Sequence, residues 1–295
     1  MEGEHIKGSP FTVTVKLPIQ KLGTPIKTIS GVKMPWGVAV NQRGDIIVAE
    51  YGGHCVSIFG PAGEKVLSFG SFGPNYGQFR YPEGVAVDSE GCILVVDYGN
   101  DRIQKFTSNG QFIIAVGKGG NKQLEFSCPY GIGIHPHTRK VYVSDSNNCR
   151  IQILNPDLTF SSSFGSKGKG NGQFMYPQDV AFDSTGNVYV VEFGNHRIQV
   201  FTAAGQFMRK IGSEGKGNGE LSHPIGISIN SDNMVYVIEK YNNRVSVFTH
   251  EGTFLSSFGS KGRGPGQFDQ LRGIAVNKNG IIIVSDQYNH RLQFF

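Results

Sequence analysis

The stretch from Tyr81 to Gly117, "YPEGVAVDSEGCILVVDYGNDRIQKFTSNGQFIIAVG", shows the pattern from which the fold can be inferred. It contains four short apolar runs, "PEGVAV", "ILVVD", "RIQKF" and "QFIIAVG", which are separated by short polar segments. Runs of this length that are bounded by Gly, Asn, Asp and Ser are typical of β-strands joined by tight turns. The stretch therefore predicts four short antiparallel strands.

The first of these runs recurs six times in the 295-residue chain, at spacings of 47, 47, 48, 47 and 47 residues. The six copies begin at Pro35, Pro82, Pro129, Pro177, Pro224 and Leu271. A four-stranded unit that repeats every ~40 to 50 residues is the signature of a β-propeller blade, because a lone small sheet cannot bury its faces until neighbours pack against it. We expect an all-β, six-bladed β-propeller of four-stranded blades.

The last repeat ends at Phe295 without a fourth strand, and the missing strand is found near the other end of the sequence. "PIKTISG", Pro25 to Gly31, has the pattern of the fourth strands "EKVLSFG" and "TFLSSFG". We therefore expect this segment to complete the final blade and close the ring, which removes an open sheet edge. Deleting residues 24–31 should lower the melting temperature of the whole ring, and thermal unfolding checks this.

An acidic residue ends each second strand, and an arginine follows it five positions later in five of the six repeats. The acids are Glu50, Asp97, Asp145, Glu192, Glu239 and Asp286, and the arginines are Arg102, Arg150, Arg197, Arg244 and Arg291. The simplest interpretation is a structural ion pair in each blade, with Cys55 in the arginine position of the first blade leaving Glu50 to pair elsewhere. Two alternatives stay open: a calcium site formed by the acids, and arginines with donors to spare for phosphate.

Cysteine usage and hydropathy indicate the compartment. Cys55, Cys92, Cys128 and Cys149 form no Cys-x-x-Cys pair, so we expect free thiols in a reducing environment. The N-terminus "MEGEHIKGSP" lacks the apolar core of a signal peptide, and no apolar run is long enough to cross a bilayer. We expect a cytoplasmic protein that does not bind membranes.

The loop "GSKGKGNGQF", Gly165 to Phe174, superficially matches a phosphate-binding loop. However, Gly170 is followed by Asn171 instead of lysine and a hydroxyl residue, and a strand pattern follows where a helix is needed. Closely similar sequences recur at Gly212 and Gly259. We therefore interpret the segment as a repeated blade-to-blade loop, and we expect no nucleotide cofactor.

The charges are distributed unequally between the two rims of the expected ring. The formal net charge is +5, and the rim with the long loops is basic while the rim with the short turns is acidic. A basic face that also carries aromatic residues suits either a protein substrate or single-stranded or hairpin RNA. The predicted contacts are Trp36, Arg80, Tyr81, Lys118, Tyr130, Lys167, Lys169, Tyr176, Lys261, Arg263 and Arg272.

Three histidines, His54, His196 and His290, occupy the same corner position in three repeats. Three converging imidazoles could bind zinc, as in a metal-dependent propeller enzyme of the lyase or lactonase class. The other repeats place Asp101, Cys149 and Asn243 at this position, which favours tolerated variation. We therefore expect no metal site and no catalytic residue, and keep the enzyme as the alternative.

The recurring elements P-x-G-[VI]-A-V, [DE]-x-x-N-x-R-[IV]-Q and F-G-x-x-G resemble NHL repeats. "EHIKGSPFTVTV", Glu4 to Val15, resembles the last strand of a filamin-type immunoglobulin domain. The resemblance implies a filamin-type strand and the start of a linker in residues 1–18, followed by an NHL propeller in residues 19–295. This order resembles the tail of tripartite-motif (TRIM-NHL) ubiquitin ligases. Their zinc would be held only by RING and B-box domains upstream, so no cofactor is expected in this chain.

Overall fold

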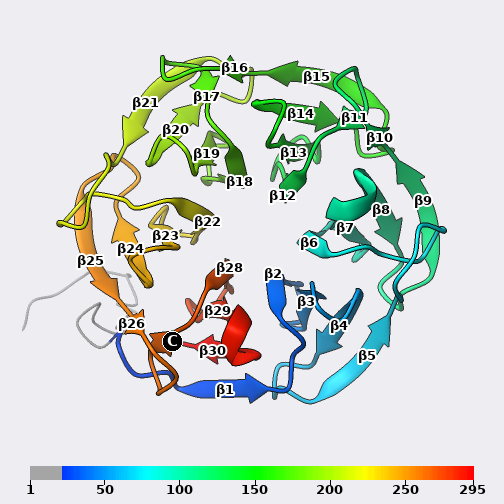
Figure 1. Cartoon of the computed structure of the whole chain (residues 1–295), viewed down its shortest axis with the longest axis horizontal. Helices are drawn as coiled ribbons and strands as arrows, with labels where there is room; N and C mark the ends of the chain where they lie inside the picture. Colours follow the sequence, from blue (N-terminus) through cyan, green and yellow to red (C-terminus); the bar gives the residue numbers. More distant parts are fainter. Residues whose placement is uncertain (1–21) are drawn as a thin grey trace, which may run out of the picture.

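The computed structural model describes residues 22–295, which form six four-stranded antiparallel sheets arranged as blades around a ring (Figure 1). The expected all-β, six-bladed propeller is confirmed. The filamin-like segment, Glu4 to Val15, and the boundary between residues 18 and 19 lie outside the described residues. None of the helical turns in residues 22–295 is long and apolar enough to span a membrane.

Each blade runs from the centre of the ring to its circumference in four strands. The innermost strands are β2 (Pro35–Val40), β6 (Pro82–Val87), β12 (Pro129–Ile134), β18 (Pro177–Phe182), β22 (Pro224–Ile229) and β28 (Leu271–Val276). The second strands are β3 (Ile46–Glu50), β7 (Ile93–Asp97), β13 (Val141–Asp145), β19 (Val188–Glu192), β23 (Val235–Glu239) and β29 (Ile282–Asp286). The third strands are β4 (Cys55–Phe59), β8 (Arg102–Phe106), β14 (Arg150–Leu154), β20 (Arg197–Phe201), β24 (Arg244–Phe248) and β30 (Arg291–Phe294). The outermost strands are β5 (Lys65–Phe69), β9 (Phe112–Val116), β15 (Phe160–Phe164), β21 (Phe207–Ile211), β25 (Phe254–Phe258) and β1 (Lys27–Ser30).

The remaining regular elements are short and lie in the long loops and corners. Within three of the loops, two-residue strands pair in parallel: β10 (Lys118–Gly119) with β11 (Glu125–Phe126), β16 (Ser166–Lys167) with β17 (Gln173–Phe174), and β26 (Ser260–Lys261) with β27 (Gln267–Phe268). Two corners contain 3₁₀ turns, η2 (Tyr98–Asn100) and η3 (Gln287–Asn289).

The first and last described segments of the chain meet in the same blade. β1 pairs antiparallel with β30, with Lys27 opposite Phe294 and Ser30 opposite Arg291. Figure 1 shows β1 on the circumference beside β30. The predicted closure of the ring by Pro25 to Gly31 is therefore confirmed.

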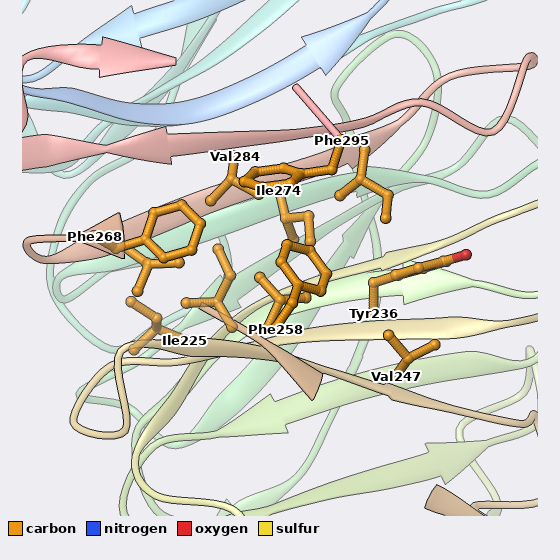
Figure 2. Close-up of a cluster of buried hydrophobic side chains, with 12 residues drawn as sticks. Ile225, Tyr236, Val247, Phe258, Phe268, Ile274, Val284 and Phe295 are labelled. Carbon is orange, nitrogen blue, oxygen red and sulfur yellow. The ribbon is translucent and has the colours of Figure 1, made fainter. Parts of the chain in front are cut away.

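The hydrophobic core is divided among the six interfaces between adjacent blades. Each interface holds one cluster of buried aliphatic and aromatic side chains. Figure 2 shows the cluster between the fifth and sixth blades, where Ile225 and Phe258 meet Phe268 and Phe295. Burying one phenylalanine side chain is worth roughly 1.5 to 3 kcal/mol. Because no blade has a core of its own, each one is stable only between its neighbours.

The long loops are anchored by the aromatic or aliphatic residue at their end. In the loop from Gly165 to Phe174, the Phe174 ring is fully buried. A Cβ atom on Gly165 would lie 2.4 Å from that ring, and the Gly165 backbone has a φ of 98°. Glycine is required there for both reasons, so the loop that superficially matches a phosphate-binding loop is a packing element.

Candidate functional site on the loop face

We use the term loop face for the rim formed by the long blade-to-blade loops and by the corners between second and third strands. At the corner of the second blade, Arg102 donates from Nε to Asp97 at 2.7 Å. Its Nη1 and Nη2 atoms donate to the backbone oxygens of Pro74, Asn75 and Gln78 in the preceding loop, at 2.7 to 2.9 Å. The arginine therefore fastens a long loop to the sheet.

The same arrangement repeats in four other blades, so the interpretation as structural ion pairs is supported. The pairs are Arg102–Asp97, Arg150–Asp145, Arg197–Glu192, Arg244–Glu239 and Arg291–Asp286, at 2.6 to 2.7 Å. The five acids are fully buried, so loss of an arginine partner costs more stability here than it would in an exposed ion pair. Since the guanidinium groups are committed to carboxylates and loop carbonyls, they have few donors left for phosphate.

The first blade departs from this pattern as its sequence predicts. Glu50 accepts from the backbone N–H of Lys33 at 2.7 Å and from the Ser57 hydroxyl, and its carboxylate lies 3.5 Å from Lys65 Nζ. The residue without an arginine partner therefore pairs with a lysine in the outer strand.

The three corner histidines hold neighbouring blades together. His54 accepts the backbone N–H of Tyr81 at Nδ1 (3.1 Å), and His290 accepts that of Met34 (3.2 Å). His196 makes the same contact, at 3.4 Å, with the next blade. All three have φ of 50° to 53°, in the left-handed region where His, Asn and Asp are enriched. This explains why Asp and Asn replace histidine elsewhere, and the three imidazoles do not converge on one ion.

The centre of the loop face is formed by the residues at the second position of the innermost strands, next to the proline or leucine that starts each strand. Here the guanidinium carbon of Arg272 lies 3.9 Å from the ring centroid of Trp36. Its Nε atom donates to the side-chain oxygen of Gln287 at 2.8 Å. In contrast to the corner arginines, Arg272 has no salt bridge within residues 22–295. The sequence-predicted residues Trp36 and Arg272 are thus brought together.

An aromatic ladder runs from the centre toward the first and second blades. Trp36 stacks on Tyr51 with ring centroids 4.9 Å apart, Tyr51 stacks on Tyr81 at 4.7 Å, and Tyr81 contacts His54 at 4.7 Å. Arg272 lies at the inner end of this ladder. The faces of the inner rings are therefore in contact with one another and with the arginine.

Glu83 is fully buried at this centre, with its Oε2 atom lacking a hydrogen-bond partner. Burial raises the pKa of Glu83 well above its usual value, although Arg272 and Lys240 oppose the shift. Burial also lowers the pKa of Lys240 to about 8, with the Arg272 charge acting in the same direction. The centre therefore combines two basic side chains, Arg272 and Lys240, with one buried acid.

The other predicted contacts lie around this centre. The ring centroid of Tyr130 is 6.3 Å from that of Trp36, so Tyr130 is part of the centre. Five other predicted residues are exposed on the surrounding loops: Tyr176, Lys167, Lys169, Lys261 and Arg263. Lys118 lies 3.5 Å from Glu125, and Arg80 lies over the ring of Phe72. The prediction missed Tyr51 and Lys240, which directly follow the acids that end their strands.

Below the centre of the loop face, the innermost strands line a cavity of about 960 Å³ that reaches the opposite rim at Asn41 and Lys278. We call the opening of this cavity on the loop face the mouth. Asp179 lines this cavity and accepts the backbone N–H groups of Val180 (2.9 Å) and Ile227 (3.1 Å). Burial raises the pKa of Asp179 to about 7. Glycine occupies the equivalent position in the other five blades, at Gly37, Gly84, Gly131, Gly226 and Gly273.

Metal-ligating side chains do not converge at the mouth. Within residues 22–295, the one group of three or more potential ligands is Asp88, Glu90 and Cys92, in a turn on the opposite rim. Asp88 there is paired with Lys105 at 2.9 Å. The cysteines are free, as the sequence predicts: Cys55, Cys92, Cys128 and Cys149.

Comparison with known proteins supports the repeat assignment. The NHL repeat matches residues 33–59, 79–106 and 174–201, and a six-bladed β-propeller family, DUF5128, matches residues 230–294. The chain therefore contains NHL repeats, as the sequence indicates. A search of curated protein sequences found no match.

Solved structures with the same fold include proteins of several kinds. The gluconolactonase XC5397 of Xanthomonas campestris is 13% identical, with a TM-score of 0.69 over 90% of this chain and 87% of its own. Virginiamycin B lyase of Staphylococcus aureus is 16% identical, with a TM-score of 0.63 over 91% and 87%. The nidogen/laminin complex contains a chain that is 19% identical, with a TM-score of 0.65 over 83% and 85%. At these identities the likeness establishes the fold alone.

Proposed function

We propose that this chain is a non-catalytic recognition module that binds a protein substrate through its loop face. We further propose that it forms the C-terminal part of a tripartite-motif ubiquitin ligase. NHL repeats preceded by a filamin-like segment support this assignment. Ligase chemistry would reside in zinc-binding domains upstream, and this chain would select the substrate.

The observation that carries the proposal is the centre of the loop face, where the aromatic ladder ends at Arg272. Trp, Tyr and Arg are the residues that most often dominate the binding energy of protein interfaces. The faces of Trp36 and Tyr51 are already covered, so they are poor platforms for stacking a base. Their edges, together with the partly buried Arg272, suit amide and carboxylate groups of a protein partner.

Single-stranded or hairpin RNA is the second candidate. Lys167, Lys169, Lys261 and Arg263 are exposed on the loops, and their side chains have no carboxylate partner within residues 22–295. Unpaired cations of this kind contact phosphate groups. Tyr176 is 44% exposed and would offer a ring for stacking.

A metal-dependent lyase or lactonase is less well supported. Such an enzyme needs several ligands that point at one ion near the channel mouth. At the mouth, Glu83 is near two cations and His223 is packed against His196 and Tyr241. This arrangement repels a cation instead of binding one.

Photo-crosslinking from defined positions tests the proposal. A photoreactive phenylalanine analogue replaces Tyr176 on the loop face or, as the matched control, Ser108 in an exposed turn on the opposite rim. After irradiation in cells, we expect discrete protein adducts from position 176 that disappear when Arg272→Ala is added, and none from position 108. Adducts that ribonuclease shortens would identify RNA as the partner. Equal adducts from both positions would contradict the loop face as the binding surface.

A further inference from the structure

The outermost strand of the second blade differs from its five counterparts. β9 reads "FIIAV", whereas the others read "KTIS", "KVLSF", "FSSSF", "FMRKI" and "FLSSF". Every outermost strand pairs with only one neighbour, so its other edge is open. β9 is the one described outermost strand without a charged or hydroxyl side chain.

The surface around β9 is apolar as well. Phe112, Ile113 and Ile114 are 37%, 46% and 39% exposed. Tyr76, which is 71% exposed, stacks on Phe112 with ring centroids 5.0 Å apart and an interplanar angle of 9°. In the loop of the fourth blade, asparagine occupies the position of Tyr76. Apolar substitutions in the strand and in the loop beside it thus form one patch.

An open and apolar sheet edge of this kind is normally avoided. Soluble proteins protect their edge strands with charges, prolines or covering segments, because the free N–H and C=O groups pair readily with other strands. The outermost strands β5 and β21 show this protection, with Lys65 in β5 and Arg209 and Lys210 in β21. β9 has neither the charges of β5 and β21 nor the serines of β15 and β25, so its open edge is the best suited of the described outermost strands to pair with another strand.

We propose that β9 pairs antiparallel with β9 of a second copy of this chain. A two-fold axis at Ile114 would place Phe112 opposite Val116 and Ile113 opposite Ala115. Every cross-strand pair would then be apolar, which stabilises an antiparallel pair, and no like charges would meet although each molecule carries a net charge of +5. The same pairing of two β21 strands would bring cations together.

The position of β9 permits this contact without disturbing the loop face. Figure 1 shows β9 on the outer circumference of the ring. Two rings can therefore meet edge to edge with both loop faces free. The symmetric pairing of one strand with itself makes a closed dimer and leaves no further edge of this kind to propagate a fibre.

Analytical ultracentrifugation of residues 1–295 tests the pairing. Since the paired edge is small, we expect a weak dimer that is populated at about 200 µM and dissociates at about 2 µM. The double substitution Ile113→Ser with Ile114→Ser, which gives β9 the serines that β15 has at the equivalent positions, should abolish the dimer. The control Val66→Ser removes an apolar side chain from β5 that is even more exposed, at 63%, and should leave the dimer intact.

Hydrogen exchange identifies the surface independently. Amides of β9 that do not bond to β8 should exchange more slowly at the higher concentration, and those of β15 should not change. A wild-type chain that stays monomeric at about 200 µM, or a dimer that survives the double serine substitution with β9 unprotected, would overturn the proposal. Circular dichroism of the serine variant checks that it remains folded.

Discussion

Arg197 at a corner and Arg272 at the centre lie on the same face of the ring, but their guanidinium groups have different partners. Arg197 pairs with the buried Glu192 at 2.6 Å and donates to two backbone oxygens of the loop before it. Arg272 lies over Trp36, has one side-chain hydrogen bond and forms no salt bridge within residues 22–295. The repeated arginine fastens a loop to its sheet, whereas the arginine that occurs once makes a single side-chain hydrogen bond, to Gln287.

This difference shows how repetition can be used to separate structure from function in a propeller. A residue that recurs in blade after blade satisfies a need that every blade has, such as fastening a loop or bridging to the next sheet. A residue that departs from the repeat at the centre, such as Trp36, Asp179 or Arg272, meets no such general need. The following predictions test the distinction.

The largest effect on stability is expected at a corner. Arg197→Ala leaves the Glu192 carboxylate buried without its charged partner, which should lower the free energy of unfolding by roughly 3 to 5 kcal/mol. Urea denaturation followed by circular dichroism measures this. Arg263→Ala, an exposed arginine on a neighbouring loop, is the control and should change stability by less than about 0.5 kcal/mol. Similar losses for both variants would show that the corner arginine contributes no more to stability than an exposed one.

Asp179 should make stability depend on pH. Because the carboxyl binds its proton more tightly in the folded state, with a pKa of about 7, its contribution to stability is greatest below its usual pKa and is lost as the pH rises toward 7. Between pH 5 and pH 8 the wild type should lose roughly 1 to 3 kcal/mol more than Asp179→Asn. Denaturation at both pH values measures the difference. Identical pH dependence in the two proteins would show that Asp179 ionises normally.

Of the substitutions at Arg197, Asp179 and Arg272, Arg272→Ala should reduce stability least and partner binding most. Within residues 22–295 this guanidinium forms no salt bridge, and Lys240 also acts on the nearby Glu83, so its removal should cost less than about 1 kcal/mol of stability. Loss of a central arginine should weaken partner binding by at least about tenfold. Crosslinking yield from position 176 reports binding, and urea denaturation reports stability. A variant that unfolds as readily as Arg197→Ala would place Arg272 with the structural arginines.

The smallest effect on stability is expected from the exposed loop cations. Replacing Lys167, Lys169, Lys261 and Arg263 together by alanine should leave the unfolding midpoint unchanged. If RNA is a ligand, the change should weaken binding and flatten the dependence of affinity on salt, because fewer counterions are released. Fluorescence anisotropy with short RNA hairpins at about 0.05 and 0.2 M salt measures this. RNA affinity that is independent of salt would reject phosphate contacts by these residues.

The repeated features of the fold could be predicted from the sequence because the period fixes their position. The prolines that start the innermost strands, the corner pairs and the closing segment from Pro25 to Gly31 all follow from spacing. The histidine bridges could not be predicted, because they depend on a left-handed backbone at the corner that places Nδ1 against the next blade. Five of the six residues at this repeated position are His, Asp or Asn, the types enriched in such a backbone, and Cys149 is the sixth.

The central site was predicted only in part. Trp36 and Tyr130 follow repeated prolines and Arg272 follows Leu271 at the same repeat position, so the repeat identifies them. Tyr51 reaches the same place from the end of a second strand, and that convergence is a property of three-dimensional packing. Asp179 could have been identified, since it replaces a glycine that the other five blades share.

The pairing of β1 with β30 also determines how the ring responds to force. Lys27 lies opposite Phe294, and the Ile26 N–H donates to the Phe294 oxygen at 2.7 Å. A pull applied between residues 26 and 295 would therefore load the hydrogen bonds of this strand pair one after another from one end, instead of all together. The ring should open like a zipper at low tension, and its seam would be its mechanically weakest point.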